Sequence, residues 1–372
     1  MEKKLLLIDG HSILNRAFYG VPDLTNSAGM HTNAVYGFLN IILKIIDEEK
    51  PTNMVVAFDV KQPTFRHKMY SEYKGTRKPM PEELREQVPL IKEVLKAMKI
   101  KIVELPGYEA DDILGTLAKR GEKEQMKVSV ITGDRDLLQL ATKNILIRIP
   151  NTKKGTTEVE NYYEDDVIEK YQVSPTEFID VKALMGDTAD NIPGVPSVGK
   201  KTATLLIVEY HSVENLYENI DNISKKKLKE NLEVNKDIAF MSKTLATINI
   251  ESPVELDFSD TTILDIFNND AYELMKKLEF KSIVNRFASK TTKNEEINIM
   301  GSYIEDFDEA DRIFIKAENQ KSIGLNIIGN DVSHEIFAIA IALSKDEIYV
   351  IKKQWFISDE YLQNKIFDIF SS

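Results

Sequence analysis

Nine acidic side chains, spread over five short segments, are the residues of this sequence whose types and spacing are best suited to chemistry. They are Asp9, Asp59, Glu109, Asp111, Asp112, Asp134, Asp136, Asp187 and Asp190. Oxygen ligands without His or Cys select hard cations, so the set predicts Mg²⁺ or Mn²⁺. Two such ions, about 3.5–4 Å apart, can clamp the attacking and leaving oxygens of a phosphodiester. The predicted chemistry is therefore hydrolysis of a phosphodiester bond.

Each acidic cluster also has an ordinary explanation. An aspartate that follows a strand is a common N-cap of the next helix, and for a single instance that explanation is the better one. With 60 acidic residues, short clusters also arise by chance, and we assign no role to Glu164–Asp166 in NYYEDDVIEK. The segment EADD, taken alone, fits chance and function equally well. Because three successive apolar runs all end in aspartate, the ensemble favours a metal site.

A basic segment lies directly after Asp59. Lys61–Lys78 holds six Lys/Arg against one Glu, with Phe65, Tyr70 and Tyr73 interleaved. Basic and aromatic side chains together suit a nucleic-acid single strand, through phosphate contacts and base stacking. A solvated charged helix is the commoner structure for such a run, but its position beside the acidic set favours binding. Arg16 lies on the helix that is expected to follow Asp9. Its side chain could equally well contact a phosphate or neutralise an aspartate.

A second binding element is predicted in NIPGVPSVGKKTATLLIVEY. The pattern indicates the end of a helix, a glycine hairpin and a new helix starting near Lys200. Gly194 and Gly199 would let backbone amides approach a phosphate, next to the helix N-terminus and Lys201. Such a hairpin follows the DNA backbone without recognising sequence. A plain Gly-Pro loop between helices is the alternative, which the spacing PGVxxVGxKTA disfavours.

These residues require a scaffold that brings distant segments together. Residues 3–9, 53–59 and 127–134 are predicted to be buried parallel strands, with a fourth in NILIRI after the helix DLLQLA. Helical patterns at 34–49 and 84–99 separate them, so the fold class is a doubly wound α/β sheet flanked by helices. Ligands of such sheets gather at the carboxyl ends of the strands, where three runs end in aspartate. Asp187 and Asp190, three apart, would share one face if helical.

We expect four regions along the chain. Residues 1–170 form the α/β core, with a basic arch at about 61–86, and residues 171–287 form a helical subdomain. Residues 288–300 are polar and aperiodic, which predicts a linker. Residues 301–372 are an incomplete second α/β unit with strands in RIFIKA, SIGLNII, IFAIAIAL and EIYVI.

Composition limits the class of protein. There is no cysteine, which excludes disulfides and thiolate metal sites and fits a reducing cytoplasm. The apolar run of residues 5–8 is too short for a signal peptide or a membrane span, so we expect a soluble, cytoplasmic protein without membrane contact. The net charge is −12, but half of it lies in residues 301–372. If the nine acids hold metal ions, the remaining surface of residues 1–300 is mildly basic.

With these segments in hand, the sequence resembles the flap endonuclease family, in the form of the 5′ nuclease domain of bacterial DNA polymerase I. The segments LLLIDGHSILNRAFY, VVAFDVKQPTFRHKMYSEYKGTR, LPGYEADDILGTLA, VSVITGDRDLLQL and ALMGDTADNIPGVPSVGKKTA are similar to that family's motifs, in its order. The similarity covers about residues 2–287. It implies a PIN-like 5′ nuclease with a helix–hairpin–helix. The implied activity is that of a 5′-3′ exonuclease and flap endonuclease of DNA replication and repair, acting on a 5′ flap or a nicked duplex.

The resemblance also implies roles for individual residues. Asp9, Asp59, Glu109 and Asp111 would hold the first of two Mg²⁺ ions, for which Mn²⁺ can substitute, and Asp134, Asp136, Asp187 and Asp190 the second, with Asp112 nearby. Asp111 would be catalytic, as would Lys74 and Arg66, which touch the scissile phosphate from the arch base. The DNA-binding residues would be Arg16, Tyr73, Arg77, Gly194, Val195, Ser197, Gly199, Lys200, Lys201 and Thr202.

Two further points follow from the resemblance. The hairpin would bind K⁺ through its backbone carbonyls, with altered affinity because Ser197 stands where glycine is usual. Residues 301–372 are similar to the opening of a 3′-5′ exonuclease-like, ribonuclease H-like domain. Its first strand, IGLNII, lacks the Asp-x-Glu metal pair, so proofreading is not expected.

The polymerase palm and fingers are absent from this sequence, and a monomer is expected. A PIN-type ribonuclease and a non-catalytic DNA-binding scaffold are the rival hypotheses.

Overall fold

The chain contains two compact units, Met1–Ala288 and Ser289–Ser372, each with a hydrophobic core of its own. The computed structural model describes residues 3–153, 156–294, 302–304, 306–320, 322–330, 335–344, 347–352 and 364. Within these residues, no helix combines the length and the apolar character needed to span a membrane.

A six-stranded sheet is the centre of the first unit, and its strands lie in the order β3-β2-β1-β4-β5-β6. The strands are β1 (Lys4–Asp9), β2 (Asn53–Ala57), β3 (Lys101–Val103), β4 (Lys127–Ile131), β5 (Ile145–Lys153) and β6 (Thr156–Tyr162). The first five are parallel, and β6 pairs antiparallel with β5. The predicted α/β fold is confirmed. Strands β3 and β6 were not predicted, because one is only three residues long and the other is polar.

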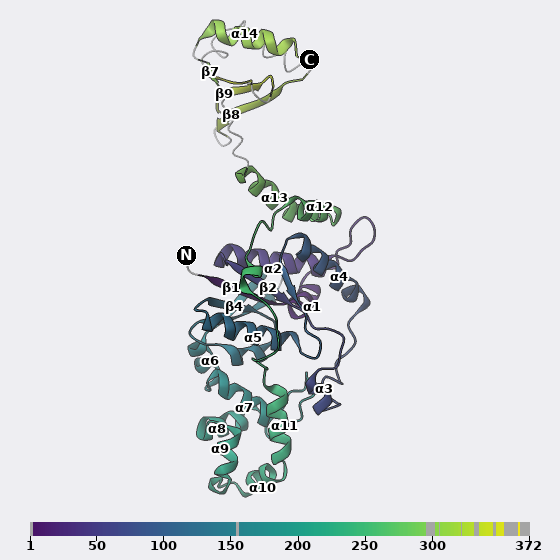
Figure 1. The fold of residues 1–372 in the computed structure, drawn as a ribbon, viewed down its shortest axis with the longest axis vertical. Helices are drawn as coiled ribbons and strands as arrows, with labels where there is room; N and C mark the ends of the chain where they lie inside the picture. The colour runs from purple at the N-terminus through teal and green to yellow at the C-terminus, as the bar shows by residue number, and fades with distance from the viewer. Residues whose placement is uncertain are drawn as a thin grey trace. The chain divides into compact units, whose positions relative to one another are not determined.

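Helices cover both faces of this sheet (Figure 1). Helices α1 (Gly10–Gly20), α2 (Asn33–Glu49) and α4 (Glu82–Ala97) enclose one core with Leu6 and Ile8, while α5 (Ala110–Lys123) encloses the other with Leu5 and Leu7. Successive side chains of a strand point to opposite faces, so β1 contributes to both cores. This double covering explains why the parallel strands are uniformly apolar.

A helical region follows the sheet. It comprises α6 (Glu164–Tyr171), α7 (Pro175–Met185), α8 (Lys200–Tyr210), α9 (Val213–Glu218), α10 (Lys226–Val234) and α11 (Lys236–Ala246), with short 3₁₀ turns η2 (Ile220–Asn222) and η3 (Phe258–Thr261). A further 3₁₀ turn, η1 (Arg135–Leu140), connects β4 to β5. The predicted helical subdomain is present, but it shares one continuous core with the sheet. The structure therefore joins residues 1–170 and 171–287 in one unit.

Helix α12 (Asn269–Lys277) and the first residues of α13 (Lys281–Asn294) complete the first unit, which ends at Ala288. Phe280 and Phe287 are fully buried in the core that α2 and α4 form. The linker was predicted to start at residue 288, and the two units do divide there, but residues 288–294 are helical, because α13 continues to Asn294. Residues 295–300 of that linker lie outside the described residues.

The described elements of the second unit are a four-stranded sheet and the helix α14. Its elements are β7 (Ser302–Ile304), α14 (Phe307–Glu318), β8 (Gly324–Asn330), β9 (Glu335–Ala342) and β10 (Ile348–Lys352), and the sheet order is β7-β10-β9-β8. The segment RIFIKA, predicted as a strand, belongs to α14. Asp306 caps that helix by accepting from the Glu309 amide (3.3 Å), and Ala310, Ile313 and Phe314 form its buried stripe.

Candidate active site

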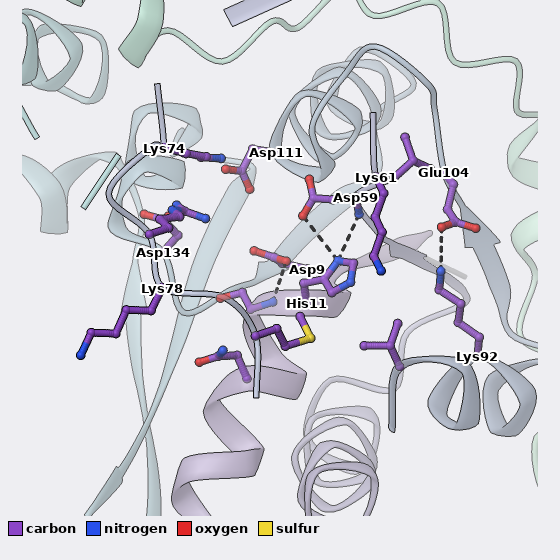
Figure 2. A pocket seen from close by; sticks show the side chains of 16 residues that line it. Asp9, His11, Asp59, Lys61, Lys74, Lys78, Lys92, Glu104, Asp111 and Asp134 are labelled. Carbon is purple, nitrogen blue, oxygen red and sulfur yellow. Dashed lines mark hydrogen bonds and ion pairs between the residues drawn. The ribbon is translucent and has the colours of Figure 1, made fainter. Parts of the chain in front are cut away.

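Four aspartates from four segments line one pocket of about 850 Å³ at the carboxyl edge of the sheet, together with Glu104. Asp9 ends β1, Asp59 follows β2, Asp134 follows β4, and Asp111 lies in the first turn of α5. Their strands are neighbours in parallel register, so the strand ends meet at the same edge. Figure 2 shows these side chains around a shared space. The structure thus brings together four of the nine predicted ligands.

Two of the three strand-end aspartates, Asp9 and Asp134, also cap the helix that follows them, as the ordinary explanation proposed, whereas Asp59 does not. Asp9 accepts from the Ser12 amide (3.0 Å) and from the Thr132 hydroxyl (2.9 Å). Asp134 accepts from the Asp136 amide (2.9 Å) at the start of η1. Asp59 accepts from the amide of Ala110 (2.8 Å), the first residue of α5. A carboxylate offers about four acceptor positions, so capping leaves capacity for a cation.

The pKa values of three of these aspartates differ from their ordinary values, because the side chains are buried and lie close to one another. Burial, followed by repulsion from Asp59, raises the pKa of Asp9 to about 6. Burial and repulsion from Asp9 and Asp134 raise the pKa of Asp111 well above its ordinary value. Burial alone would raise the pKa of Asp59 as well, but hydrogen bonds with His11 and the Ala110 amide lower it to about 2. A cation in this pocket would relieve the repulsion.

The other predicted ligands are paired with protein cations. Lys74 Nζ lies 2.9 Å from Glu109 Oε1 and 3.8 Å from Asp190 Oδ2, and Arg77 also bonds to Asp190. Lys182 Nζ lies 2.6 Å from Asp136 Oδ1 and also bonds to Asp187. The described residues contain no group of three Asp, Glu or His side chains already close enough to hold a metal ion. A cation bound by the full predicted set would therefore have to displace these lysines and Arg77.

Asp187 and Asp190 do not share a helical face, so that prediction was wrong. Gly186 ends α7 at a φ of +75°, and the chain turns sharply there. The amides of Asp187 and Ile192 each donate to the other's carbonyl at 2.8 Å, which closes a tight loop. The two carboxylates consequently face different partners.

Asp112 and Arg66 form a closed, fully buried ion pair. Asp112 is 0% and Arg66 2% exposed. Their two parallel bonds are both 2.8 Å, and Asp112 also accepts from the amides of Glu109 (3.1 Å) and Asn249 (2.8 Å). These four bonds occupy the acceptor positions of the carboxylate. The placement of Asp112 among the metal ligands is therefore wrong in this structure.

Arg66 has no donor left for a phosphate. Beyond Asp112, it donates from Nε to the Leu245 carbonyl (2.9 Å), from Nη2 to the Thr247 carbonyl (2.7 Å), and from Nη1 to Glu109 (3.4 Å). A guanidinium has five N–H groups, and all five are used. Arg66 was predicted to touch the scissile phosphate, and the structure instead gives it the role of fixing helix α3 (Phe65–Met69) to α5, to the end of α11 and to the residue that follows it.

Tyr73 is also too deeply buried to contact DNA. Its side chain is 3% exposed, and its hydroxyl lies 3.1 Å from Glu109 and 3.2 Å from Asp190. Burial and the nearby acids raise the pKa of the phenol, so the hydroxyl stays a proton donor. A buried ring cannot stack on a base, and the stacking prediction for Tyr73 is wrong here.

Basic side chains of the arch form the rim of the pocket. Lys61, Lys74, Arg77 and Lys78 line it together with the acids, and Figure 2 labels three of these lysines. Lys74 has a left-handed φ of +58°, a conformation that is uncommon outside glycine. Its amide donates to the Asp190 carbonyl (2.8 Å), and Asn191 Nδ2 donates to the Glu72 carbonyl (2.7 Å). The arch base is thus joined to the loop after α7.

Arg16 lies beside a second hollow of about 320 Å³, which Ser12, Asn15, Tyr19 and Gly133 also line. It makes no ion pair with an acidic side chain of the described residues, so neutralisation of an aspartate is not observed. Burial, followed by repulsion from Arg135, lowers the pKa of Arg16. Of the two open explanations, the structure favours contact with an anion.

The first half of the hairpin is held by contacts within the protein. The Gly194 amide donates to Ser242 Oγ (3.1 Å), and the Val195 amide donates to the Leu184 carbonyl (2.8 Å). A Cβ on Gly194 would lie 2.2 Å from the Gly186 nitrogen, so the close approach of two backbones requires glycine. The prediction that Gly194 lets a backbone amide approach a phosphate is therefore wrong, and the amide of Val195, a predicted DNA-binding residue, is likewise used inside the protein.

The second half of the hairpin is accessible. Gly199 is the N-cap of α8 and forms no side-chain capping bond, and the first amides of a helix have no partner within it. Lys200 and Lys201 are exposed, and Thr202 follows them in the first turn. Ser197 adopts a left-handed φ of +63°, which explains why glycine would be usual there.

Two further side chains of the site, His11 and Lys182, were not predicted. His11 lies 3.4 Å from Asp59 Oδ2, and Lys182 bridges Asp136 and Asp187. His11 stands two residues after Asp9, inside a segment already singled out. Lys182 is the single charged residue of the apolar stretch VKALM, directly before the acidic loop. A charge inside an apolar stretch is the sequence feature that could have pointed to this residue.

Comparison with known proteins identifies relatives along most of the chain. The model of the 5′-3′ exonuclease N-terminal resolvase-like domain matches residues 4–172, and that of the 5′-3′ exonuclease C-terminal SAM fold matches residues 173–269. DNA polymerase I of Bacillus subtilis strain 168 is 49% identical over 295 residues, 79% of this chain and 33% of that polymerase. DNA polymerase I of Geobacillus stearothermophilus is 43% identical over 352 residues, 94% of this chain and 40% of that polymerase.

A solved structure shares the fold. The flap endonuclease of bacteriophage T5, in a pseudo-enzyme-product complex with DNA and metal ions, matches with a TM-score of 0.55 at 22% identity. The match covers 78% of this chain and 98% of the phage enzyme. The chain spans between a third and two fifths of the length of the two polymerases. Residues 4–269, which contain the acidic pocket and the hairpin, belong to the 5′-3′ exonuclease family.

Proposed function

We propose that this chain is a metal-dependent, structure-specific 5′ nuclease that acts on DNA with a 5′ single-stranded flap or a nick. The observation that carries the proposal is the pocket of Asp9, Asp59, Asp111 and Asp134 beneath a basic rim, within a domain of the 5′-3′ exonuclease family. The relatives are much longer polymerases, so their activities come to this chain only as part of this proposal. A cytoplasmic monomer is part of it too.

The chemistry of the pocket fits divalent cations. Its four aspartates offer only oxygen ligands, which suit Mg²⁺, and Mn²⁺ can substitute. Burial, followed by repulsion between neighbouring carboxylates, raises the pKa values of Asp9 and Asp111. Cations held there would supply activation of a water molecule and stabilise charge on the phosphate. The T5 flap endonuclease, a structural relative, has been solved with metal ions and DNA.

Lys74 and Arg77 are the residues that would hold the scissile phosphate. Both line the pocket, and both are at present paired with the acids Glu109 and Asp190. In the complex with DNA, the side chains of Lys74 and Arg77 would leave their carboxylate partners and bind the phosphate instead. They would then stabilise the negative charge of the phosphate in the transition state. The oxygen of water would bond to phosphorus, and the bond to O3′ would break. The products are a 5′ phosphate and a 3′ hydroxyl.

The remaining DNA would lie along α1 and α8. The first amides of α8, with Lys200, Lys201 and Thr202, suit a phosphate of the duplex, because the helix N-terminus carries a partial positive charge. Backbone carbonyls of the hairpin, such as that of Ser197, would hold K⁺. Arg16, beside its polar hollow, would contact a further phosphate. These contacts recognise the backbone and not the base sequence.

The proposal is tested with a 5′-labelled DNA flap in the presence and absence of Mg²⁺. Wild type should cleave only with Mg²⁺. Asp111→Asn should lower the cleavage rate by more than about 100-fold, beyond the effect typical of residues that only support a ligand. Flap binding by this variant should stay within a few-fold. The control Asp165→Asn changes an exposed acid on α6 and should leave the rate unchanged.

Other results would point to the rival hypotheses. Full activity of Asp111→Asn would contradict the metal assignment. Cleavage of an RNA flap but not of the DNA flap would favour a ribonuclease. Flap binding that is insensitive to chelator, without turnover at any Mg²⁺ concentration, would favour a DNA-binding scaffold.

A further inference from the structure

A single lysine lies between two of the predicted metal ligands. Lys182 is on α7, and its side chain is 13% exposed. Its Nζ lies 2.6 Å from Asp136 Oδ1, on η1, and also bonds to Asp187 in the loop after α7. These two carboxylates come from different segments, and Lys182 is the protein cation that joins them.

The type of side chain matters for what this contact can do. A lysine ammonium is a compact charge on a flexible four-carbon stem, so it can leave one partner without moving the backbone. Arg66, by contrast, is locked by five bonds and cannot leave Asp112. Lys182 is therefore a removable cation, whereas Arg66 is a permanent one.

Like charges bring a second constraint. Asp136 lies next to Asp134 in η1, and Asp187 accepts from the amide of Ala189 (2.7 Å). Without a cation between them, Asp136 and Asp187 would repel each other. With Lys182 in place, each carboxylate has one charge partner, and a divalent ion can reach both only if the ammonium moves away.

We infer that Lys182 is an internal counter-ion that holds Asp136 and Asp187 in the cation-free protein and competes with a divalent cation for both carboxylates. It thereby sets the cation concentration at which these two residues become ligands. The inference rests on the proposed function, because it takes Asp136 and Asp187 to be among the metal ligands.

The direction in which the metal affinity changes when Lys182 is replaced distinguishes a competing cation from a residue that orients the ligands. A residue that orients ligands strengthens metal binding, so its removal weakens affinity by about 10- to 100-fold. A competing cation does the opposite, and its removal strengthens affinity. The cation-free protein should at the same time lose stability, because two carboxylates lose their partner.

Lys243 provides a matched control. Its Nζ lies 2.6 Å from Asp180 Oδ1 and 2.6 Å from Glu214 Oε2, so it also bridges two carboxylates, on α7 and α9. Neither acid lines the pocket. The experiment compares wild type, Lys182→Met, Lys182→Arg and Lys243→Met. Mn²⁺ binding is measured by calorimetry, and thermal melting with and without Mn²⁺.

Lys182→Met should bind Mn²⁺ about tenfold more tightly than wild type. Its melting temperature should fall without the metal and recover when Mn²⁺ is added. Lys182→Arg, which keeps the charge, should resemble wild type in cation-free melting. Lys243→Met should also melt earlier, but Mn²⁺ should not restore it, and its Mn²⁺ affinity should equal that of wild type.

Equal or weaker Mn²⁺ affinity in Lys182→Met would overturn the inference, as would absence of Mn²⁺ binding in all four proteins. Flap cleavage separates this result from the proposed function. If wild type cleaves the flap with Mg²⁺ while Lys182→Met shows unchanged affinity, only the inference fails. If Lys182→Met binds Mn²⁺ more tightly but no protein cleaves a flap, the inference stands and the nuclease proposal fails.

Discussion

At the scale of single residues, hydrogen-bond capacity separates side chains that the sequence presents as equivalent. Arg66 and Arg77 belong to the same basic segment, yet every donor of Arg66 is used inside the protein, whereas Arg77 lines the pocket. Asp111 and Asp112 are adjacent, yet only Asp111 faces the pocket. Which member of each pair can meet a ligand depends on how many of its donors or acceptors remain available.

The left-handed backbone of Ser197 gives a stability prediction. A side chain at positive φ costs about 1–2 kcal/mol, and glycine adds about 0.5–1 kcal/mol of unfolded-chain entropy. Ser197→Gly should therefore stabilise the protein by up to about 1 kcal/mol in urea denaturation, since φ is +63°. Ser212→Gly is the control, because Ser212 is an N-cap with a φ of −154° and should lose a few tenths of a kcal/mol. A Ser197→Gly variant no more stable than the control would contradict this account.

At the scale of elements, hydrogen bonds between loops place the arch over the acids. Lys74 and Asn191 tie the arch base to the loop after α7, and Arg66 ties α3 to the end of α11 and to the residue that follows it. The hairpin begins in that same loop, at Gly194. The arch base and the duplex-binding hairpin are thus connected through a few residues of backbone.

A charge network between β6, α6 and η1 gives a pH prediction. Glu160 accepts from Tyr162, from Lys170 (3.1 Å) and from Arg135 (3.1 Å). The Tyr162 hydrogen bond, against a small effect of burial, lowers the pKa of Glu160 to about 2. A lowered carboxyl pKa stabilises the fold above the unfolded value of about 4.3 and is lost as the pH falls towards 2.

The urea midpoint of Glu160→Gln should therefore lie below that of wild type at pH 6, and the gap should narrow as the pH falls from about 4.5 towards 2. Urea denaturation of both proteins at pH 6, 4 and 2.5 measures this difference in midpoint. Glu158→Gln, an exposed change on the same strand, is the surface control. A gap of constant size across this range would show that Glu160 acts through packing and not through its charge.

At the scale of the whole molecule, the boundary of the first unit lies beyond the matched family models. Those models end at residue 269, whereas α12 and α13 add Met275, Phe280 and Phe287 to the core against α2 and α4. Each buried phenylalanine contributes about 1.5–3 kcal/mol. The natural end of this unit thus lies within α13, just after Phe287.

A fragment of residues 1–294 should consequently cleave the DNA flap within about twofold of the full chain, whereas a fragment of residues 1–269 should melt at a clearly lower temperature. The physical reason is that the second fragment exposes the apolar surface that α12 and α13 cover. Flap cleavage and thermal melting of both fragments check this. Loss of activity in the 1–294 fragment with an unchanged melt would mean that the second unit contributes to the site.

The sequence by itself determined the family, the parallel sheet and the edge at which the acids gather. Apolar runs ending in aspartate are local patterns, and parallel strands bring their ends to one edge whatever the rest of the chain does. It was less reliable where local patterns are ambiguous, as in RIFIKA, which has strand-like composition but a capped, helical stripe of buried residues.

Only the tertiary structure decided which charges are available. Arg66 and Asp112 are 46 residues apart, and Tyr73 and Asp190 are 117 apart. No spacing rule connects such residues, because hydrophobic periodicity places elements and says nothing about which polar groups meet between them. Burial gives each of these pairings a consequence, since a buried charge must be paired and a paired charge can bind a ligand only by giving up its partner.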